Sequence, residues 1–211
     1  MTDFLFDGPE DARVTILLAH GAGAPMDSAS MTAATKALVE AGFRVARFEF
    51  AYMAGRRGPD GRKPPPRADK VMPEYAQAIT DLKAKGPLII GGRSMGGRVA
   101  SMVADEEFTK GRIRGVLCLG YPFHPPGRPE QLRTAHLEDI ECPVLIVQGT
   151  RDEFGMPDEV STYPLSKQVR VLWLEDGDHD LRPRKAISGF TLAQHLTTMA
   201  DTVAEWTKAI A

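Results

Sequence analysis

A serine in a glycine-rich hexapeptide is the first candidate for chemistry in this chain. Residues 92–97 read Gly-Arg-Ser-Met-Gly-Gly, which places Ser94 in the pattern G-x-S-x-G. An apolar run at 88–91 precedes it and a helix-forming stretch follows, the strand–turn–helix setting of a nucleophilic serine. Glycines on both sides suit so sharp a turn, because larger side chains would clash there. The alternative is a glycine-rich turn that binds a phosphate at the N-terminus of the helix.

A serine hydroxyl is a weak nucleophile, so it needs a neighbouring base and a carboxylate that orients the base. Asp152 lies four residues beyond the apolar run 144–148, and His179 follows the run 169–174. Each candidate therefore comes just after a predicted strand, with the acid before the histidine, as a hydrolase site requires. The sequence predicts Ser94 as nucleophile, His179 as base and Asp152 as its orienting acid. Activity should fall at acid pH as His179 becomes protonated.

Other acids and histidines are weaker candidates. Asp176 and Asp178 are too close in sequence to His179 to come from a separate strand end. His195 falls within the predicted last helix and His136 within a polar segment, so both are expected to be structural or solvated.

The first apolar run ends in His-Gly-Ala-Gly at residues 20–23. Such a strand end can donate one backbone N–H to a developing oxyanion, and the residue after the nucleophile donates the other. We therefore expect the N–H groups of Met95 and Ala22 to form the oxyanion hole, with Gly23 as the alternative to Ala22. His20 is expected to brace this loop rather than to take part in the chemistry.

Short apolar runs alternate with helical patterns along the whole chain. The predicted strands are 14–19, 43–50, 88–91, 113–119, 144–148 and 169–174, and the predicted helices are about 28–41, 73–86, 95–105 and 191–209. The strands are continuously apolar, which is typical of a mostly parallel sheet covered by helices on both faces. The length and the lack of a second core predict a single domain over residues 1–211.

Composition narrows the class of protein. The chain has 211 residues, 43% hydrophobic and 26% charged, which indicates a globular rather than a disordered protein. The 26 basic and 28 acidic residues nearly balance, so no nucleic-acid partner is expected. Cys118 and Cys142 lie beside apolar runs and are expected to be buried thiols, since two such residues make neither a disulfide framework nor a zinc site.

The N-terminal residues have no basic region followed by an apolar stretch, and no apolar run is long enough to span a bilayer. We therefore expect a cytoplasmic protein without a membrane segment. The chemistry of the candidate residues requires no cofactor and no metal ion.

Residues 52–72 differ from the rest of the chain. They hold six basic residues against two acidic ones, and four prolines. We expect no regular structure here, but either a solvated loop or a loop over the site, where Arg56 and Arg57 could attract an anionic acyl group. The expected substrate-binding residues are Tyr52, Arg56, Phe123 and His124.

The motifs at 20–23, 92–97, 149–152 and 177–179 together resemble the α/β-hydrolase superfamily over residues 13 to 210. Within it, the chain is similar to small capless members near the dienelactone hydrolases. Residues 120–127 and 55–57 look like a subgroup that includes testis-expressed and NSL-complex-subunit-like proteins. The resemblance implies a three-layer α/β sandwich with a mostly parallel sheet of about six to eight strands and no cap domain. Dienelactone hydrolase has a cysteine where this chain has Ser94, so cleavage of dienelactones is not expected.

The sequence thus predicts a serine hydrolase that cleaves a small carboxylic ester or thioester through an acyl-enzyme. The short connection before the strand at 144 predicts a shallow, open site. A monomer or weak dimer is expected. Two alternatives stay open: a protein-binding scaffold that uses the basic residues 52–72, and acyl transfer or perhydrolysis by the same triad.

Overall fold

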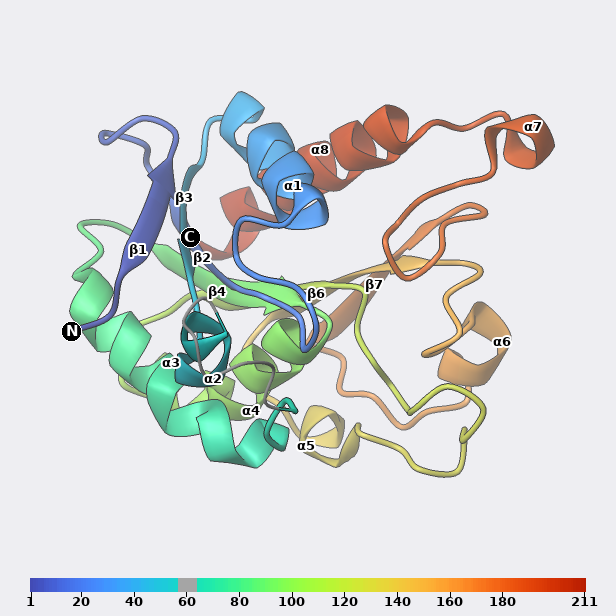
Figure 1. The fold of residues 1–211 in the computed structure, drawn as a ribbon, viewed down its shortest axis with the longest axis horizontal. Helices are drawn as coiled ribbons and strands as arrows, with labels where there is room; N and C mark the ends of the chain where they lie inside the picture. Colours follow the sequence, from blue (N-terminus) through green and yellow to red (C-terminus); the bar gives the residue numbers. More distant parts are fainter. Residues whose placement is uncertain (57–63) are drawn as a thin grey trace.

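A seven-stranded sheet forms the centre of the protein in the computed structural model, which describes residues 1–56 and 64–211 (Figure 1). Its order is β1-β3-β2-β4-β5-β6-β7, with β1 antiparallel and the other strands parallel. The strands are β1 (Phe4–Asp7), β2 (Thr15–Ala19), β3 (Arg44–Phe48), β4 (Leu88–Arg93), β5 (Gly115–Leu119), β6 (Val144–Gly149) and β7 (Val169–Leu174). The expected mostly parallel sheet is confirmed.

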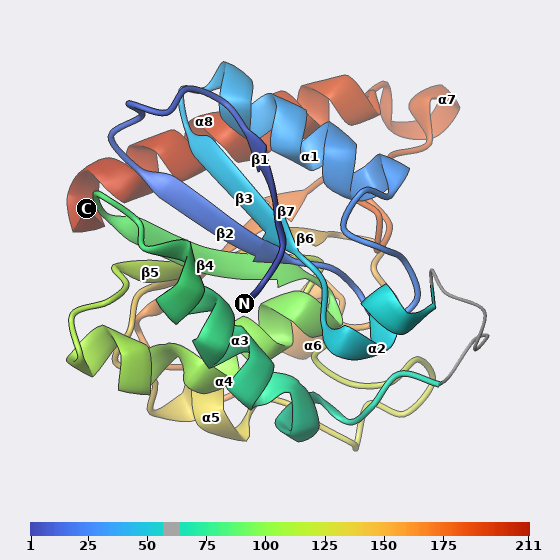
Figure 2. The ribbon, with the colours of Figure 1, turned by 60° about the vertical axis from the view of Figure 1, so that its left-hand side comes forward.

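Helices cover both faces of this sheet (Figure 2). One face packs against α1 (Ala29–Glu40) and α8 (Leu192–Ile210), and the other against α3 (Ala68–Leu82) and α4 (Met95–Thr109). Four short helices lie in the connections: α2 (Ala51–Gly55), α5 (Ala135–Glu138), α6 (Pro157–Val160) and α7 (Lys185–Ser188). The three-layer sandwich that the sequence predicts is therefore present.

The continuous apolar runs follow from burial on two sides. Along β5, Val116 and Cys118 join the core beneath α3 and α4, whereas Leu117 and Leu119 join the core beneath α1 and α8. Since successive residues of a strand point to opposite faces, a strand covered on both faces needs apolar residues at every position. Cys118 is one of two free, buried cysteines in the structure, as expected.

The region around residues 52–72 departs from expectation. The helix expected at 73–86 begins at Ala68 and ends at Leu82, and α2 precedes it. Pro73 is the sixth residue of α3 and therefore lies inside the helix, where its missing N–H removes one helical hydrogen bond. The expectation of no regular structure over 52–72 is thus wrong at both ends of that stretch, and its middle, 57–63, lies outside the described residues.

Several small elements were not expected. Strand β1 is an edge strand with Leu5 and Phe6 exposed, so it lacks the apolar pattern of a buried strand. Helices α5, α6 and α7 span only four residues each, which is too short to show helical periodicity. Among the described residues, no helix has the length and apolar character that crossing a lipid bilayer demands.

The order of the strands decides where a ligand can bind. From β2 the chain crosses to β3 on one side, and later places β4 on the other side of β2. In an open α/β sheet, such a reversal leaves a crevice at the carboxyl ends of the two strands. The segment at 20–23 follows β2, and Ser94 follows β4, so both lie at this reversal.

One buried hydroxyl connects α3 to the two strands that meet there. The Tyr75 hydroxyl accepts the N–H of Gly91 at 2.9 Å and lies 3.1 Å from the carbonyl oxygen of Leu17. Tyr75 has no exposed surface. It therefore fixes α3 against β2 and β4 only three residues before Ser94.

Replacing Tyr75 by phenylalanine should lower the free energy of unfolding by about 1–3 kcal/mol, because the buried N–H of Gly91 would lose its acceptor. Urea denaturation followed by circular dichroism measures this loss. The control is Tyr163→Phe, since the Tyr163 hydroxyl is buried without a hydrogen-bond partner. Equal losses in the two variants would contradict the assigned role of the Tyr75 hydroxyl.

Candidate active site

Ser94 occupies a strained position between β4 and α4. Its backbone has φ 49° and ψ −116°, a region that non-glycine residues rarely adopt. The Ser94 N–H donates to the carbonyl oxygen of Leu119, and its own carbonyl accepts the N–H of Arg98, both at 3.0 Å. The sheet and the first turn of α4 therefore hold the serine in this conformation, with its side chain partly exposed.

The glycines around Ser94 let this turn approach β2. A Cβ atom on Gly92 would lie 2.3 Å from the carbonyl oxygen of Ala19, and one on Gly96 would lie 2.5 Å from the same oxygen. Real Cβ atoms do not come so close to backbone, so no larger residue fits at either place. The G-x-S-x-G pattern is thus required by the packing of the turn against the end of β2.

Asp152 and His179 form a hydrogen-bonded pair. The Nδ1 atom of His179 lies 2.8 Å from Oδ2 of Asp152, which is completely buried. The same Oδ2 accepts a hydrogen bond from Nε2 of Gln148 at 2.9 Å. The other oxygen, Oδ1, accepts a hydrogen bond from the backbone N–H of Phe154, also at 2.9 Å. A carboxylate accepts this bond, so Nδ1 carries the proton and Nε2 is left as the basic nitrogen.

Neighbouring residues position the histidine. Arg93 donates from Nη2 to the carbonyl oxygen of His179 at 3.1 Å and forms a 2.6 Å ion pair with Asp180. The ring of Phe154 packs against the imidazole, with 4.2 Å between ring centroids. Sequence reasoning missed Arg93, Gln148 and Phe154. The one available signal was Gln148, a polar residue that ends an otherwise apolar strand.

Two open hollows meet at Ser94, each of about 420 Å³. Both are lined by Ala22, Ser94 and Phe154. The first also includes Gly21, Gly23, Arg93, His179, Asp180 and Arg182, and the second includes Met95, Arg98, Arg133, Pro122, Pro66 and Arg67. The structure therefore brings Ser94, His179 and the expected oxyanion-hole residues together around one open surface.

The loop at 20–23 is braced from behind. The buried His20 lies 2.6 Å from the Gly21 carbonyl through Nδ1 and accepts the N–H of Phe50 through Nε2 at 3.2 Å. Tyr52 donates its hydroxyl to the carbonyl oxygen of Ala22 at 3.1 Å, and burial raises the pKa of this phenol to about 12. Arg56 approaches the same oxygen at 3.5 Å.

Tyr52 and Arg56 therefore do not occupy the place that the sequence suggested. Neither lines the two hollows beside Ser94. Both contact the Ala22 carbonyl, so they support the backbone of the loop instead of facing a substrate there. Arg57, expected to attract an anion together with Arg56, lies outside the described residues.

Phe123 and His124 are also displaced from the expected role. Phe123 has no exposed surface and packs against Tyr121 and Tyr163. His124 is 2% exposed, with Nε2 3.5 Å from a carboxylate oxygen of Glu159. Side chains so deeply buried cannot contact a substrate in this conformation. Residues that follow a parallel strand often line a site at the sheet edge, but this segment folds back into the core.

A second serine–histidine pair lies nearby, between Ser101 and His136, at 2.8 Å. The Ser101 hydroxyl donates its one proton to the carbonyl oxygen of Arg98 at 2.8 Å, so in this arrangement it accepts from His136. A nucleophilic serine needs the opposite direction. Ser101 is also 3% exposed. Burial and the Arg98 charge lower the pKa of His136 to about 4, which keeps it neutral.

The competing acids make other contacts. Asp176 is hydrogen-bonded to Arg184 and Arg151, and the bond to Arg184 holds its pKa far below the usual range. Asp178 accepts the backbone N–H groups of Asp180 and Arg182. Neither carboxylate contacts the imidazole, whereas Asp152 does. His195 is buried within α8, with Nδ1 2.9 Å from the Leu181 carbonyl.

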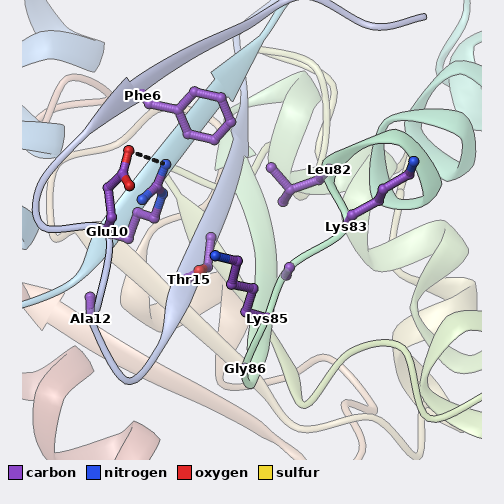
Figure 3. Close-up of a pocket in the computed structure, with 10 residues that line it drawn as sticks. Phe6, Glu10, Ala12, Thr15, Leu82, Lys83, Lys85 and Gly86 are labelled. Atoms are coloured by element: carbon purple, nitrogen blue, oxygen red, sulfur yellow. Dashed lines mark ion pairs between the residues drawn. The ribbon is translucent and has the colours of Figure 1, made fainter.

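A separate pocket of about 160 Å³ lies at the opposite end of the strands (Figure 3). Thr15 at the start of β2 and Gly86 before β4 line it, as do Arg44 and Glu10, which form an ion pair at 3.9 Å. It is far from the carboxyl ends of the strands and adds nothing to the Ser94 site. Within residues 1–56 and 64–211, no group of three or more His, Cys, Asp or Glu side chains is arranged to hold a metal ion.

Comparison with known families gives the class of protein. The profile of a family described as alpha/beta hydrolase domain matches residues 12–208. The chain belongs to this alpha/beta hydrolase family. Its α/β-hydrolase fold carries no cap domain, because the connection from β5 to β6 spans only residues 120–143 and holds only the short α5. Family membership supports a hydrolase activity.

Solved structures agree on the α/β-hydrolase fold. Est1E from Butyrivibrio proteoclasticus, in a structure described with ferulic acid bound, has a TM-score of 0.71 at 17% identity, covering 99% of this chain and 95% of its own. XC6422 from Xanthomonas campestris, described as a serine hydrolase without a lid, has a TM-score of 0.69 at 20% identity, covering 97% and 89%. Dienelactone hydrolase from Anabaena variabilis has a TM-score of 0.67 at 18% identity, covering 99% and 92%. At these identities the likeness concerns the fold.

The glycine contacts of this α/β-hydrolase turn can be tested by adding one methyl group. Gly96→Ala would place a Cβ within 2.6 Å of two backbone oxygens, so we expect the free energy of unfolding to fall by about 1–3 kcal/mol. The control is Gly55→Ala, because a Cβ at Gly55 meets nothing within 4 Å. Thermal and urea denaturation of both variants measure the difference. A Gly96→Ala protein as stable as the wild type would disprove the proposed close approach.

Proposed function

We propose that residues 1–211 form one domain that acts as a serine hydrolase on carboxylic esters or thioesters, through an acyl-enzyme on Ser94. The observation that carries this proposal is the hydrogen bond from His179 Nδ1 to the buried Asp152, together with the hollow that His179 and Ser94 both line. A strained serine beside an oriented imidazole is the arrangement that nucleophilic acyl transfer needs.

In the proposed reaction the Ser94 hydroxyl oxygen attacks the acyl carbon while His179 Nε2 takes its proton. The tetrahedral intermediate then collapses as the C–O or C–S bond breaks, and the imidazolium returns the proton to the departing alcohol or thiol. Water attacks the acyl-enzyme with His179 again as base, which releases the carboxylic acid and restores Ser94.

Asp152 is proposed to orient His179 and to stabilise its charged form. Three hydrogen bonds, from His179, Gln148 and the Phe154 backbone, satisfy the buried carboxylate. These bonds fix both oxygens, so the imidazole has one favoured orientation. That preorganisation is the contribution expected of the acid in such a triad.

The oxyanion hole is proposed to consist of the N–H groups of Met95 and Ala22. Met95 is the first residue of α4, whose N-terminal N–H groups have no helical acceptors. The Gly21 carbonyl lies against the His20 ring, and in a trans peptide the following N–H points the opposite way. The Ala22 N–H is therefore directed away from His20. Gly23, which lines the same hollow, stays the alternative donor.

A fluorophosphonate probe tests the proposal directly, since it labels serines that a base and an oxyanion hole activate. We expect one adduct on the wild type, mapped to Ser94 by peptide mass spectrometry, and none on Ser94→Ala. Ester hydrolysis should fall by about 10⁶ in kcat for Ser94→Ala and about 10⁴ for Asp152→Asn.

The second serine–histidine pair supplies matched controls. His179→Ala should abolish labelling and hydrolysis, whereas His136→Ala and Ser101→Ala should leave both largely intact. Labelling that depends on Ser101 and His136 would overturn the assignment. If the folded wild type gives no adduct at all, the hydrolase proposal fails and a partner-binding role for residues 52–72 becomes the next candidate.

A further inference from the structure

Two arginines beside Ser94 have no acidic partner. Arg98 and Arg133 line the same hollow as Ser94 and Met95. In the described part of the chain, neither guanidinium forms an ion pair or a hydrogen bond with another residue, and Nε of Arg98 is buried without a partner. We propose that Arg98 and Arg133 bind an anionic group of the substrate, a carboxylate or a phosphate. This inference rests on the proposed hydrolase function and names its substrate class.

The backbone places both arginines firmly at this hollow. Arg98 lies in the first turn of α4, and its N–H donates to the Ser94 carbonyl at 3.0 Å. The backbone N–H of Arg133 donates to the Phe123 carbonyl at 2.8 Å, and the backbone carbonyl of Arg133 accepts a hydrogen bond from the Tyr121 hydroxyl at 2.9 Å. Because Tyr121 and Phe123 have no exposed surface, a buried support fixes the backbone of Arg133.

Of the other arginines that line the two hollows, Arg93 and Arg67 form ion pairs, and Arg182 lines only the first hollow. Arg93 pairs with Asp180 at 2.6 Å, and Arg67 pairs with Asp69 at 3.1 Å at the rim of the hollow. In the lining of the second hollow, Arg67 and Asp69 cancel each other, so the positive charges of Arg98 and Arg133 remain unpaired. The whole chain, by contrast, has a net charge of −2. Positive charge at this place is therefore a local feature and not a consequence of composition.

The two charges also act on each other. Burial and the neighbouring Arg98 charge lower the pKa of Arg133. Two like charges in a partly buried setting destabilise each other until an anion lies between them. A carboxylate or phosphate accepts from two guanidinium groups at once, which makes arginine well suited to such recognition. The positive end of α4 adds to the attraction.

The hollow also has room for such a group. Its volume of about 420 Å³ is within the usual range for small-molecule sites, and it begins at Ser94 itself. An acyl compound bonded to Ser94 can therefore extend a charged end toward Arg98 and Arg133. Pro65 and Pro66 at the edge of the hollow carry no charge. The positive charges of Arg98 and Arg133 are therefore the main polar feature that a bound group would meet there.

The test compares two esters that differ in one charge: the mono-4-nitrophenyl ester of glutaric acid, which is anionic, and its neutral methyl ester. The wild type should have a higher kcat/KM for the anionic ester. Arg98→Gln and Arg133→Gln should each reduce the anionic-to-neutral ratio of kcat/KM at least about tenfold, mainly through KM, and Arg98→Lys should restore part of it. Competition by glutarate and by inorganic phosphate shows which anion the pair prefers.

The matched control is Arg128→Gln, because Arg128 is exposed on the same connection as Arg133 but does not line the hollow. Its ratio should equal that of the wild type. An unchanged ratio in both Arg98→Gln and Arg133→Gln, in proteins with wild-type circular dichroism, would overturn the inference while ester hydrolysis still supports the proposed function.

A binding measurement separates the two proposals. Ser94→Ala protein should bind monomethyl glutarate by calorimetry, and adding Arg98→Gln or Arg133→Gln should weaken this binding at least about tenfold. Arginine-dependent binding without fluorophosphonate labelling of the wild type would support the anion site and reject the hydrolase proposal. Binding that does not change with the arginines would reject the anion site by itself.

Discussion

The close approach of the β4–α4 turn to the end of β2 is the constraint on which the rest of the site depends. The carbonyl oxygen of Ala19 occupies the space where side chains at Gly92 and Gly96 would lie. Because the two strands are adjacent and parallel, their carboxyl ends bring the segment at 20–23 beside Ser94. The proposed nucleophile and the candidates for the oxyanion hole therefore come from one packing contact, although they are about 70 residues apart in sequence.

Holding Ser94 in a positive-φ conformation costs energy, which surrounding contacts must offset. The Leu119 carbonyl and the first turn of α4 bind the serine backbone, and the fully buried Tyr75 fixes the strand just before it. On the other side of the site, the buried Gln148 bridges the Tyr121 backbone and Asp152. The site is thus built from turns that a continuous apolar sheet makes rigid.

The sequence was sufficient to predict the parts that a simple pattern controls. Strands buried on both faces must be apolar throughout, so β2, β4, β5, β6 and β7 could be predicted. The ends of β6 and β7 also predicted that Asp152 and His179 lie close together, and they share a hydrogen bond; their catalytic roles stay a prediction. Strand β1 and the short helices carry no such pattern. The burial of Phe123 and His124, and the contacts of Tyr52 with the Ala22 carbonyl, depend on how loops fold back on the core. Local sequence does not determine those paths.

Selectivity in a site without a cap has to come from few contacts. A cap domain would enclose a substrate and discriminate by shape, but here short segments leave both hollows open. Apolar surfaces that stay partly exposed to water discriminate weakly, because a bound group is not fully desolvated there. In the proposed anion site, Arg98 and Arg133 would supply a directional interaction that works at a partly open surface, since a bidentate ion pair depends on geometry as well as on burial. Charge can therefore replace enclosure as the means of choosing a substrate.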